Sequence, residues 1–430
     1  MIDINHLRKD PEFFRKACRA KNITPDTVDA VLRYDDERRT FIAEVETLRQ
    51  ERNSITREIK HYLVNTKDTD QKSRIEDARK QVSEIKRRLE DVEPQLKRAD
   101  EHYREMVRRI PNPPRPDVKI GKDDSENEIL RKWGTARKFD FKPKDHLELG
   151  ELHDIIDVKR AAKVSGTRFY YLKGDGARLE WALLAFTIET LTKEGFTPLI
   201  PPVLIKKESM GGMGYLEHGG EDDMFILDRD NLVLVGTSEQ SIGPMHMNEV
   251  FEKKQLPLRY FGYSACFRRE AGSYGKDTRG IIRVHQFNKV EMFSFTTAED
   301  GDREHDYFLS LEEKFFRELE IPYQVVKMCS GDLGAPAARK YDLEAWMPTQ
   351  EKYREVTSTS TTTDFQSRRL NIKYRDGTGI DYVHMLNGTA FSMGRPIVAI
   401  LENNQEKDGS IRIPNVLQKW MGKERIGARN

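Results

Sequence analysis

Apolar residues recur at heptad spacing through most of the segment between Phe41 and Ile110, and this pattern constrains the fold more than any other feature. From Phe41 to Tyr62 the gaps between them alternate between four and three residues, with one polar interruption at Arg52. From Ile75 to Ile110 the same alternation continues without a break. Such spacing is typical of the buried seam of a coiled coil. The segment is therefore expected to be almost entirely helical.

The polar stretch Asn65–Asp70 separates the two heptad runs and is rich in turn-forming residues. An antiparallel helical hairpin over about residues 35–109 is therefore predicted, and its second helix should be about 50 Å long at 1.5 Å per residue. Pro94 lies inside that second helix. Because proline has no N–H to donate, a kink or an interrupted hydrogen bond is expected there.

Periodicity alone leaves the role of this hairpin open between a dimerisation or spacer element and a long arm that reaches a large partner. Basic residues suited to phosphate contacts are spread along it: Arg49, Arg52, Arg57, Lys60, Lys72, Arg74, Arg79, Lys80, Lys86, Arg87 and Arg88. Acidic residues are interleaved with them, as on any solvated coiled-coil exterior. The whole chain has 73 Lys and Arg against 72 Asp and Glu, so global basicity gives no argument for nucleic-acid binding.

Four prolines in six residues, from Pro111 to Pro116, follow the hairpin. They end the helix and predict a stiff, extended linker over residues 111–120. Beyond it the heptads disappear, and residues 121–430 are expected to form a mixed α and β domain. The apolar segments expected to form strands are Asn231–Gly236, Arg259–Tyr263 and Ile397–Leu401, and the expected helices are about Leu179–Glu194, Glu239–Phe251 and Asp302–Leu319.

Targeting and metal-binding signals are weak throughout the chain. No apolar run approaches the roughly 18 residues that a membrane helix needs, and the charged N-terminus does not resemble a secretion signal. Cys18, Cys266 and Cys329 are far apart and form neither a zinc-binding nor a disulfide spacing, and His246 and His384 also lack ligand spacing. We expect a cytoplasmic protein with reduced cysteines, no membrane association and no zinc.

A charged, glycine-rich segment from Cys266 to Gly280 is the strongest candidate for chemistry. Its charged residues are Arg268, Arg269, Glu270, Lys276 and Arg279. An expected strand follows, in which period-two alternation places these side chains on one face: Arg283, His285, Phe287, Lys289 and Glu291. Guanidinium groups bind phosphate and carboxylate oxygens in a fork, and an aromatic ring beside cations suits a nucleotide base. From the residues alone, a polyphosphate site and a solvated hairpin with surface ion pairs are equally favoured.

The segment from Phe267 to Glu291 resembles motif 2 of the class II aminoacyl-tRNA synthetases, and specifically that of the seryl-tRNA synthetase family. Four further segments agree with that family in order: Gly195–Leu204 resembles motif 1, Thr237–Glu239 the TxE element, Glu355–Arg369 the stretch before motif 3, and Leu386–Asn403 motif 3. The N-terminal residues, the coiled-coil hairpin and the Ile-Pro-Asn sequence after it resemble the bacterial form. The resemblance therefore covers essentially the whole chain.

This resemblance implies an α+β fold, with an antiparallel catalytic sheet of six or seven strands flanked by helices and an N-terminal coiled-coil arm. It implies activation of L-serine with ATP to seryl-adenylate, with release of pyrophosphate, and then transfer of serine to the 3′-terminal adenosine of tRNA-Ser. Residues 1–110 become a tRNA-binding domain whose arm crosses the long variable arm and the elbow of the tRNA. The resemblance also implies charging of tRNA-Sec and a homodimer with motif 1 at its interface.

Residue roles follow from the same resemblance. The catalytic residues are Arg268, which bridges the α-phosphate and the serine carboxylate, Arg395, which holds the γ-phosphate, and Glu355, which binds Mg²⁺ together with Ser358. The implied ATP-binding residues are Arg268, Arg269, Glu270, Arg283, Val284, Phe287, Lys289, Glu355, Val356, Thr357, Ser358 and Arg395. The implied serine-binding residues are Thr237, Ser238, Glu239, Arg268, Glu291, Asn387 and Thr389.

The chain departs from the family pattern at three positions near the expected site. Thr359 and Thr361 stand where Cys and Asn are common, and Ala390 stands where many members have Gly. The metal-side serine is kept, so these changes concern local packing more than chemistry.

Three alternative functions remain open at this point. A paralogue that loads serine onto another acceptor typically lacks the arm, whereas the heptads are present here. A non-catalytic scaffold is expected to lose Arg268, Glu355 or Arg395, and all three are present. A threonine or proline synthetase usually carries a C-terminal anticodon-binding domain, whereas only residues 405–430 follow motif 3.

Overall fold

The computed structural model describes residues 1–65, 71–271, 277 and 279–427. Contacts divide the chain into two compact units. The helical unit consists of residues 2–19 and 24–110. The other unit consists of Met1, residues 20–23 and residues 111–430, and it is called the catalytic unit after the activity that the resemblance implies. The turn predicted at Asn65–Asp70 and the loop residue Lys276 lie outside the described residues, apart from Asn65 at the end of a helix.

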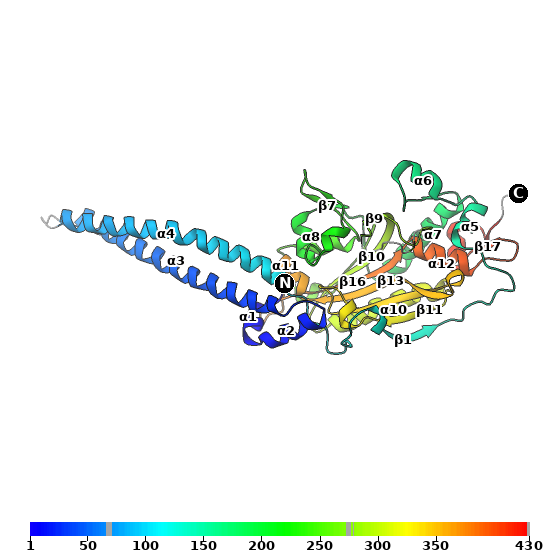
Figure 1. The fold of residues 1–430 in the computed structure, drawn as a ribbon, viewed down its shortest axis with the longest axis horizontal. Helices are drawn as coiled ribbons and strands as arrows, with labels where there is room; N and C mark the ends of the chain where they lie inside the picture. Colours follow the sequence, from blue (N-terminus) through cyan, green and yellow to red (C-terminus); the bar gives the residue numbers. More distant parts are fainter. Residues whose placement is uncertain (66–70, 272–276, 278, 428–430) are drawn as a thin grey trace. The chain divides into compact units, whose positions relative to one another are not determined.

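The helical unit is built from α1 (Ile4–Lys9), α2 (Pro11–Ala20), α3 (Asp26–Asn65) and α4 (Gln71–Arg108). Figure 1 shows α3 and α4 side by side. Their seam buries the predicted heptad residues Val45, Leu48, Ile85, Leu89 and Val92. The predicted helical hairpin is therefore confirmed for the described residues.

Ion pairs on the outside of the seam fix the direction of the two helices. Arg38 Nη1 lies 3.4 Å from Asp100 Oδ1, and Arg49 Nη2 lies 2.8 Å from Glu93 Oε1. Glu44 pairs with Arg88. Arg38 therefore meets a later part of α4 than Glu44 and Arg49 do, which is the antiparallel arrangement. Pro94 is exposed, and α4 continues through it to Arg108. Pro94 has no N–H to donate to the carbonyl four residues earlier. Because the position is exposed, water can donate to that carbonyl and the helix does not end.

The catalytic unit is organised around an eight-stranded sheet. In spatial order its strands are β1 (Glu128–Trp133), β11 (Tyr323–Lys327), β12 (Arg339–Met347), β13 (Lys352–Thr363), β16 (His384–Ser392), β10 (Gln286–Thr296), β9 (Leu258–Phe267) and β4 (Thr197–Leu199). The first seven are antiparallel to their neighbours, and β4 joins β9 in parallel at the edge. The expected antiparallel α+β fold is confirmed, with one more strand than the resemblance implied.

Three long helices pack in the same core: α7 (Asp175–Lys193), α10 (Gly301–Glu318) and α12 (Gly394–Asn403). The smaller elements are α5 (His146–Leu152), α6 (Val158–Ser165), α8 (Lys207–Met213), α9 (Glu239–Ile242), α11 (Phe365–Leu370), α13 (Gln418–Met421), β2 (Ile156–Asp157), β3 (Tyr171–Leu172), β5 (Leu204–Lys206), β6 (Ile226–Leu227), β7 (Leu232–Leu234), β8 (Val250–Glu252), β14 (Lys373–Arg375), β15 (Ile380–Tyr382), β17 (Ile411–Arg412) and β18 (Arg425–Ile426).

Two of the predicted elements are wrong. Ile397–Leu401 was expected to be a strand, but it is the centre of α12, where every residue is buried. A helix buried on all sides shows a continuous apolar run, and such a run resembles a buried strand. The helix predicted over Glu239–Phe251 is the single turn of α9 followed by a 3₁₀ turn over Gly243–His246, because Pro244 lacks the N–H needed to continue it.

The linker after the hairpin is fixed to the catalytic unit rather than free. The Asn112 side-chain amide donates to the carbonyl oxygens of Pro336 and Thr362, at 2.9 and 2.8 Å. Lys21 Nζ donates to the Gly334 carbonyl at 2.8 Å and also to that of Ala337. Both side chains therefore hold the loop that precedes β12.

In the described part of the chain, no helix combines the length and the apolar character that crossing a membrane requires. The three cysteines are buried and have free thiols, as expected for packing residues.

Candidate functional site

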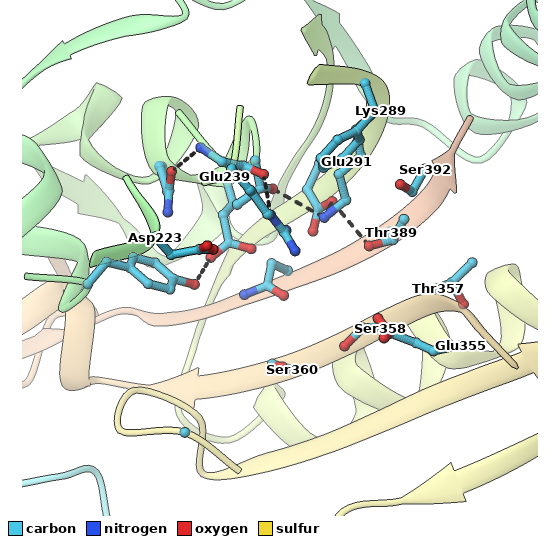
Figure 2. Close-up of a pocket in the computed structure, with 18 of the residues that line it drawn as sticks. Asp223, Glu239, Lys289, Glu291, Glu355, Thr357, Ser358, Ser360, Thr389 and Ser392 are labelled. Atoms are coloured by element: carbon cyan, nitrogen blue, oxygen red, sulfur yellow. Dashed lines mark hydrogen bonds and ion pairs between the residues drawn. The ribbon is translucent and has the colours of Figure 1, made fainter. Parts of the chain in front are cut away.

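A cavity of about 420 Å³ opens on the catalytic sheet, where β9, β10, β13 and β16 meet the first turn of α12. Residues 215–240 and the loop before β12 close its other sides. Figure 2 shows carboxylate, hydroxyl and ammonium groups from separate strands directed into it. All of the residues that line it belong to the catalytic unit.

One end of this cavity holds two buried carboxylates and one lysine. Glu239 is 4% exposed and Glu291 is 1% exposed. Lys289 Nζ forms an ion pair with Glu291 and lies 3.3 Å from Thr237 Oγ1. Thr389 Oγ1 donates to Glu291 Oε2 at 3.3 Å (Figure 2).

The charges at this end are unbalanced in favour of a cationic ligand. Burial raises the pKa of Glu239 to about 7, and the neighbouring charge of Glu291 adds to the rise while Lys289 opposes it. Burial also raises the pKa of Glu291, against the opposing charge of Lys289. The hydroxyl of Tyr215 donates to Glu239. An ammonium group entering here would relieve the electrostatic cost of two carboxylates that share one lysine.

The other end of the cavity is lined by arginines. Arg268 lies 5.4 Å from the centre of the Phe287 ring, and its Nε donates to the Gly236 carbonyl at 3.1 Å. Arg283 pairs with Glu270. These guanidinium groups are held in place before any ligand binds, which is the arrangement required for recognising a polyanion.

Arg395, in the first turn of α12, forms an ion pair with Glu355 on β13. Its Nη1 lies 3.0 Å from Glu355 Oε2 and donates to the Glu355 carbonyl at 2.8 Å. Burial favours the neutral form of Glu355, but the charges of Arg395 and Lys340 outweigh it and lower the pKa of this carboxyl to about 2. Glu355 is therefore ionised and paired near neutral pH.

A β-bulge explains how Glu355 and Ser358 both line the cavity. Side chains three residues apart on a regular strand point to opposite faces. Here Leu343 pairs with Thr357 while Glu344 pairs with Glu355, so β13 has one extra residue at this point. The extra residue re-aims Glu355 to the face that carries Ser358 (Figure 2).

A second register shift has the same effect on β16. Glu291 pairs with Thr389, Val290 pairs with Phe391, and Lys289 pairs with Ser392. Ala390 is the extra residue, so Thr389 and Ser392 both reach the cavity although they are three positions apart. Ala390 is completely buried, which shows that the methyl group in place of the more usual glycine is accommodated.

Most of the predicted site residues meet in this cavity: Thr237, Glu239, Arg268, Glu270, Arg283, Val284, Phe287, Lys289, Glu291, Glu355, Val356, Thr357, Ser358, Asn387, Thr389 and Arg395. Two do not line it. The Ser238 hydroxyl is buried and donates to the Gly262 carbonyl at 3.1 Å. Arg269 lies over the Phe225 ring and donates to the Met224 carbonyl at 2.7 Å.

The single face predicted for the strand after the loop is only partly observed. β10 begins at Gln286, so Arg283 and His285 precede it. Phe287 lines the cavity from within the strand. His285 Nδ1 lies 3.0 Å from the Arg268 carbonyl, which gives this histidine a supporting rather than a chemical role.

Several polar residues of the cavity were not identified from the sequence: Tyr215, Asp223, Gln240, Lys340, Ser360 and Ser392. Lys340 lies on β12, two positions before the buried Asp342. Burial and the charge of Glu355 raise the pKa of Asp342 to about 7, while Lys340 opposes the rise. Charged residues at alternate positions of an otherwise apolar strand were a signal for this pair.

Two oxygen-bearing side chains on β13 are suitable ligands for a hard divalent cation. Glu355 offers a carboxylate and Ser358 a hydroxyl, both on the cavity surface. Among the described residues, no group of three or more His, Cys, Asp or Glu side chains is placed to hold a metal ion. A site with few protein ligands suits Mg²⁺, which is usually bound by one or two carboxylates together with substrate phosphates and water.

Comparison with known proteins agrees with the geometry over the whole chain. Residues 1–114 match the seryl-tRNA synthetase N-terminal domain, and residues 224–404 match the tRNA synthetase class II core domain (G, H, P, S and T). The chain is 47% identical to the serine–tRNA ligase of Acidothermus cellulolyticus over 422 residues, which cover 98% of both chains.

Two solved structures share the fold from end to end. The seryl-tRNA synthetase of Pyrococcus horikoshii, complexed with ATP, is 39% identical with a TM-score of 0.89, and the match covers 100% of both chains. The cytoplasmic serine–tRNA ligase of Naegleria fowleri, in complex with AMP, is 31% identical with a TM-score of 0.86, and the match covers 100% of this chain and 99% of that one. With the relative above, these matches establish that the chain belongs to the serine–tRNA ligases, a family of class II aminoacyl-tRNA synthetases.

Proposed function

We propose that this serine–tRNA ligase carries out both steps of its reaction in the cavity on the catalytic sheet. In the first step a serine carboxylate oxygen bonds to the α-phosphorus of ATP, and the bond from that phosphorus to the bridging oxygen breaks to release pyrophosphate. In the second step a ribose hydroxyl of the 3′-terminal adenosine of tRNA-Ser bonds to the seryl carbonyl carbon, and the bond from that carbon to the phosphate oxygen breaks to release AMP. The observation that carries this proposal is the placement of buried acids at one end of the cavity and arginines at the other.

The arginine end would bind ATP and stabilise the charge that develops at the α-phosphate. The charge of Arg268 acts on both buried carboxylates of the acidic end and on that of Glu355 as well. Arg268 would therefore contact both the α-phosphate and the serine carboxylate. Arg395 and Arg283 would hold the outer phosphates, and each would exchange a protein carboxylate partner for phosphate oxygens. Phe287 would stack on the adenine ring, and Glu270 would accept a hydrogen bond from the adenine amino group. Preorganised cations are usually the largest contribution to such a transfer.

Magnesium would be held by Glu355 and Ser358, and when bound it would neutralise phosphate charge. Lys340 already supports the ionised state of Glu355. The remaining residues proposed for ATP binding are Arg269, Val284, Lys289, Val356 and Thr357. Arg269 would act indirectly, because its guanidinium is held by Met224 and Phe225.

The acidic end would bind serine. Glu239 and Glu291 would receive the substrate ammonium, and Thr237 and Thr389 would offer hydroxyl groups to the serine side chain. Ser238, which lies outside the cavity lining, and Asn387, which is part of it, would support these residues. A site built to hydrogen-bond a substrate hydroxyl rejects an analogue without one, by about 10⁴–10⁵-fold in favourable cases, because buried polar groups would lose their partners.

Residues 1–110 are proposed as the tRNA-binding domain, residues 111–120 as its linker and residues 121–430 as the catalytic domain. Along the hairpin, Arg57, Lys60, Lys72 and Arg74 are exposed. We infer that such residues contact phosphates of the long variable arm and the elbow, where shape rather than sequence is recognised. The same contacts would accept tRNA-Sec.

A homodimer in the cytoplasm is also proposed. Two large apolar side chains around the motif 1 resemblance are exposed. Trp181 of α7 is 63% exposed, and Ile200, directly after β4, is 92% exposed. Covering such residues is the usual function of a subunit interface. Sedimentation equilibrium of the wild-type protein and of Trp181→Glu tests this assignment, since the variant should shift toward the monomer.

The activity is tested by ATP–pyrophosphate exchange with serine, threonine, alanine and cysteine, followed by charging of total tRNA. Exchange specific for serine, together with charging, is the expected result. Exchange without charging would favour a paralogue that loads serine onto another acceptor. Absence of exchange by a folded protein would contradict the proposal.

A further inference from the structure

Asp342 is a buried carboxylate on β12 to which none of the roles above assigns a function. It is 7% exposed, and it pairs directly with Ser358 across the β12–β13 ladder. Residues directly opposite in an antiparallel pair have side chains on the same face, with Cβ atoms about 4.5–5.5 Å apart. Since Ser358 lines the cavity, Asp342 lies immediately beneath the cavity surface.

The residues near Asp342 on β12 and β13 also pair across the ladder with their side chains on the cavity face. Lys340, two positions earlier on β12, pairs with Ser360, and both line the cavity. Lys340 Nζ lies 3.4 Å from Asp342 Oδ1. On the far side of Ser358, the bulge in β13 brings Glu355 onto the same face. Asp342 is therefore enclosed by the two proposed magnesium ligands and one lysine.

The position of Asp342 opposite Ser358 determines which group the serine hydroxyl can reach. The two residues pair across the ladder, and a hydrogen bond from Ser358 favours the ionised form of the Asp342 carboxylate. Bound magnesium would favour the ionised form of Asp342. Because an ionised carboxylate only accepts, the hydroxyl proton of Ser358 would then point toward Asp342. The lone pairs of the Ser358 oxygen then face away from Asp342, toward the cavity. Asp342 Oδ1 is buried and has no hydrogen-bond partner apart from its ion pair with Lys340, so the carboxylate has a lone pair to spare.

We propose that Asp342 is a positioning residue that accepts the hydroxyl proton of Ser358 and thereby presents the Ser358 oxygen to the magnesium ion. The inference rests on the proposed function, because it takes Glu355 and Ser358 as the metal ligands. It adds a residue that acts through Ser358 and does not itself contact the metal. Groups that orient metal ligands in this way commonly change metal affinity by 10–100-fold when they are removed.

The test is binding of Mn²⁺ in the presence of α,β-methylene-ATP, which the enzyme cannot cleave at the α-phosphate. Free Mn²⁺ is measured by electron paramagnetic resonance, so the readout does not depend on activity. Asp342→Ala should weaken Mn²⁺ binding by about 10–100-fold. Asp342→Asn retains an oxygen acceptor and should weaken it less. Asp381→Asn removes the same charge from an exposed position on β15, outside the cavity, and should change binding by less than about threefold.

A double-mutant cycle separates orientation of Ser358 from a general structural role. If Asp342 acts through Ser358, then Asp342→Ala should have no further effect on Mn²⁺ binding in a Ser358→Ala background. Additive losses, or unchanged binding in both Asp342 variants, would overturn the proposal. If Asp342→Ala fails to fold, Asp342→Asn and its cycle with Ser358→Ala decide the question alone.

Failure of the underlying metal assignment gives a different result. In that case Glu355→Gln and Ser358→Ala would themselves leave Mn²⁺ binding unchanged in the otherwise wild-type protein. Weaker binding in those two variants, with wild-type binding in both Asp342 variants, would leave the magnesium site intact and reject only the role of Asp342.

Discussion

The helical unit and the catalytic unit are stabilised by different kinds of contact. In the hairpin, α3 and α4 pack along one repeating seam, and each buried residue meets the same kinds of neighbour one heptad further on. In the catalytic unit, several adjacent strands come from distant parts of the chain, such as β16 beside β10 and β1 beside β11. The hairpin can therefore lose or gain heptads and remain a hairpin, whereas the cavity requires every strand in its register.

This difference separates the two steps of the reaction by their structural requirements. All of the residues proposed for adenylate formation lie in the catalytic unit. The residues proposed to contact the body of the tRNA lie in the helical unit. Variants in one unit should therefore affect one step of the reaction and spare the other. Measuring the two steps separately in each variant tests this expectation.

The largest effect is expected at Arg268, which joins the two ends of the cavity. Arg268→Ala should reduce serine-dependent ATP–pyrophosphate exchange by at least about 10²–10³-fold, because a preorganised charge aimed at the transition state is lost. The protein should remain folded by circular dichroism. Arg375→Ala, at an exposed position at the end of β14, is the matched control and should exchange normally. Near-wild-type exchange by the Arg268 variant would contradict the motif 2 assignment.

The second effect concerns the hairpin alone. Replacing residues 53–85 with a short Gly-Ser turn keeps the ion pairs of Glu44 with Arg88 and of Arg49 with Glu93, and keeps the seam beneath them. Charging of tRNA-Ser should fall by at least about 10²-fold while exchange stays within twofold, because phosphate contacts supply much of the affinity. If charging survived, the distal hairpin would be only a spacer.

A full-length variant distinguishes hairpin charge from hairpin length. It replaces these basic residues with glutamine: Arg57, Lys60, Lys72, Arg74, Arg79 and Lys80. If the hairpin acts through phosphate contacts, this variant should also lose charging, and the salt dependence of tRNA binding should become weaker. Normal charging would show that shape or other residues carry the recognition.

The two units also differ in how far the sequence alone could describe them. The hairpin could be predicted almost completely, because its partner is specified by the same seven-residue repeat that marks the helix itself. The motif residues of the site could be identified by resemblance, since most of them meet in one cavity. The bulges that place Glu355 and Ser358, or Thr389 and Ser392, on one face could not be predicted, because a register shift depends on the neighbouring strand.

Other residues were missed for a related reason. Asp342 and Lys340 lie on a strand that no motif marks, and their role depends on the pairing of β12 with β13. Tyr215 reaches Glu239 from a separate loop 24 positions away. The error at Ile397–Leu401 came from burial on all sides, which removes the periodic signal that distinguishes a helix from a strand.

A smaller effect is expected from the seam itself. Leu89→Ala removes a side chain that is 5% exposed in the heptad cluster and should destabilise the helical unit by about 2–5 kcal/mol. Thermal unfolding followed by circular dichroism at 222 nm should show an earlier helical transition, while exchange at 25 °C is unchanged. Loss of exchange along with the early transition would show that the two units unfold as one.

The smallest effect is a pH dependence at the acidic end of the cavity. Because burial and Glu291 hold the pKa of Glu239 near 7, this carboxyl is mostly protonated at pH 6 and mostly ionised at pH 8. The serine ammonium requires the ionised form, so the KM for serine in the exchange reaction should fall by up to about tenfold between these values.

The raised pKa of Glu239 affects the stability of the fold in the opposite direction to serine binding, because stability falls as pH rises. The folded pKa of Glu239 lies above its unfolded value of 4.5, so its favourable contribution is complete below pH 4.5 and is lost as pH rises through 7. Glu239→Gln cannot titrate, so it should flatten the KM profile and remove this part of the stability profile together. A KM profile that keeps its shape in the variant would assign the titration to another group, with Glu291 as the nearest carboxylate to test. The buried carboxylates of the acidic end thus lower stability near neutral pH and at the same time raise the affinity for a cationic substrate. The apolar residues of the hairpin seam carry no charge and therefore have no such cost.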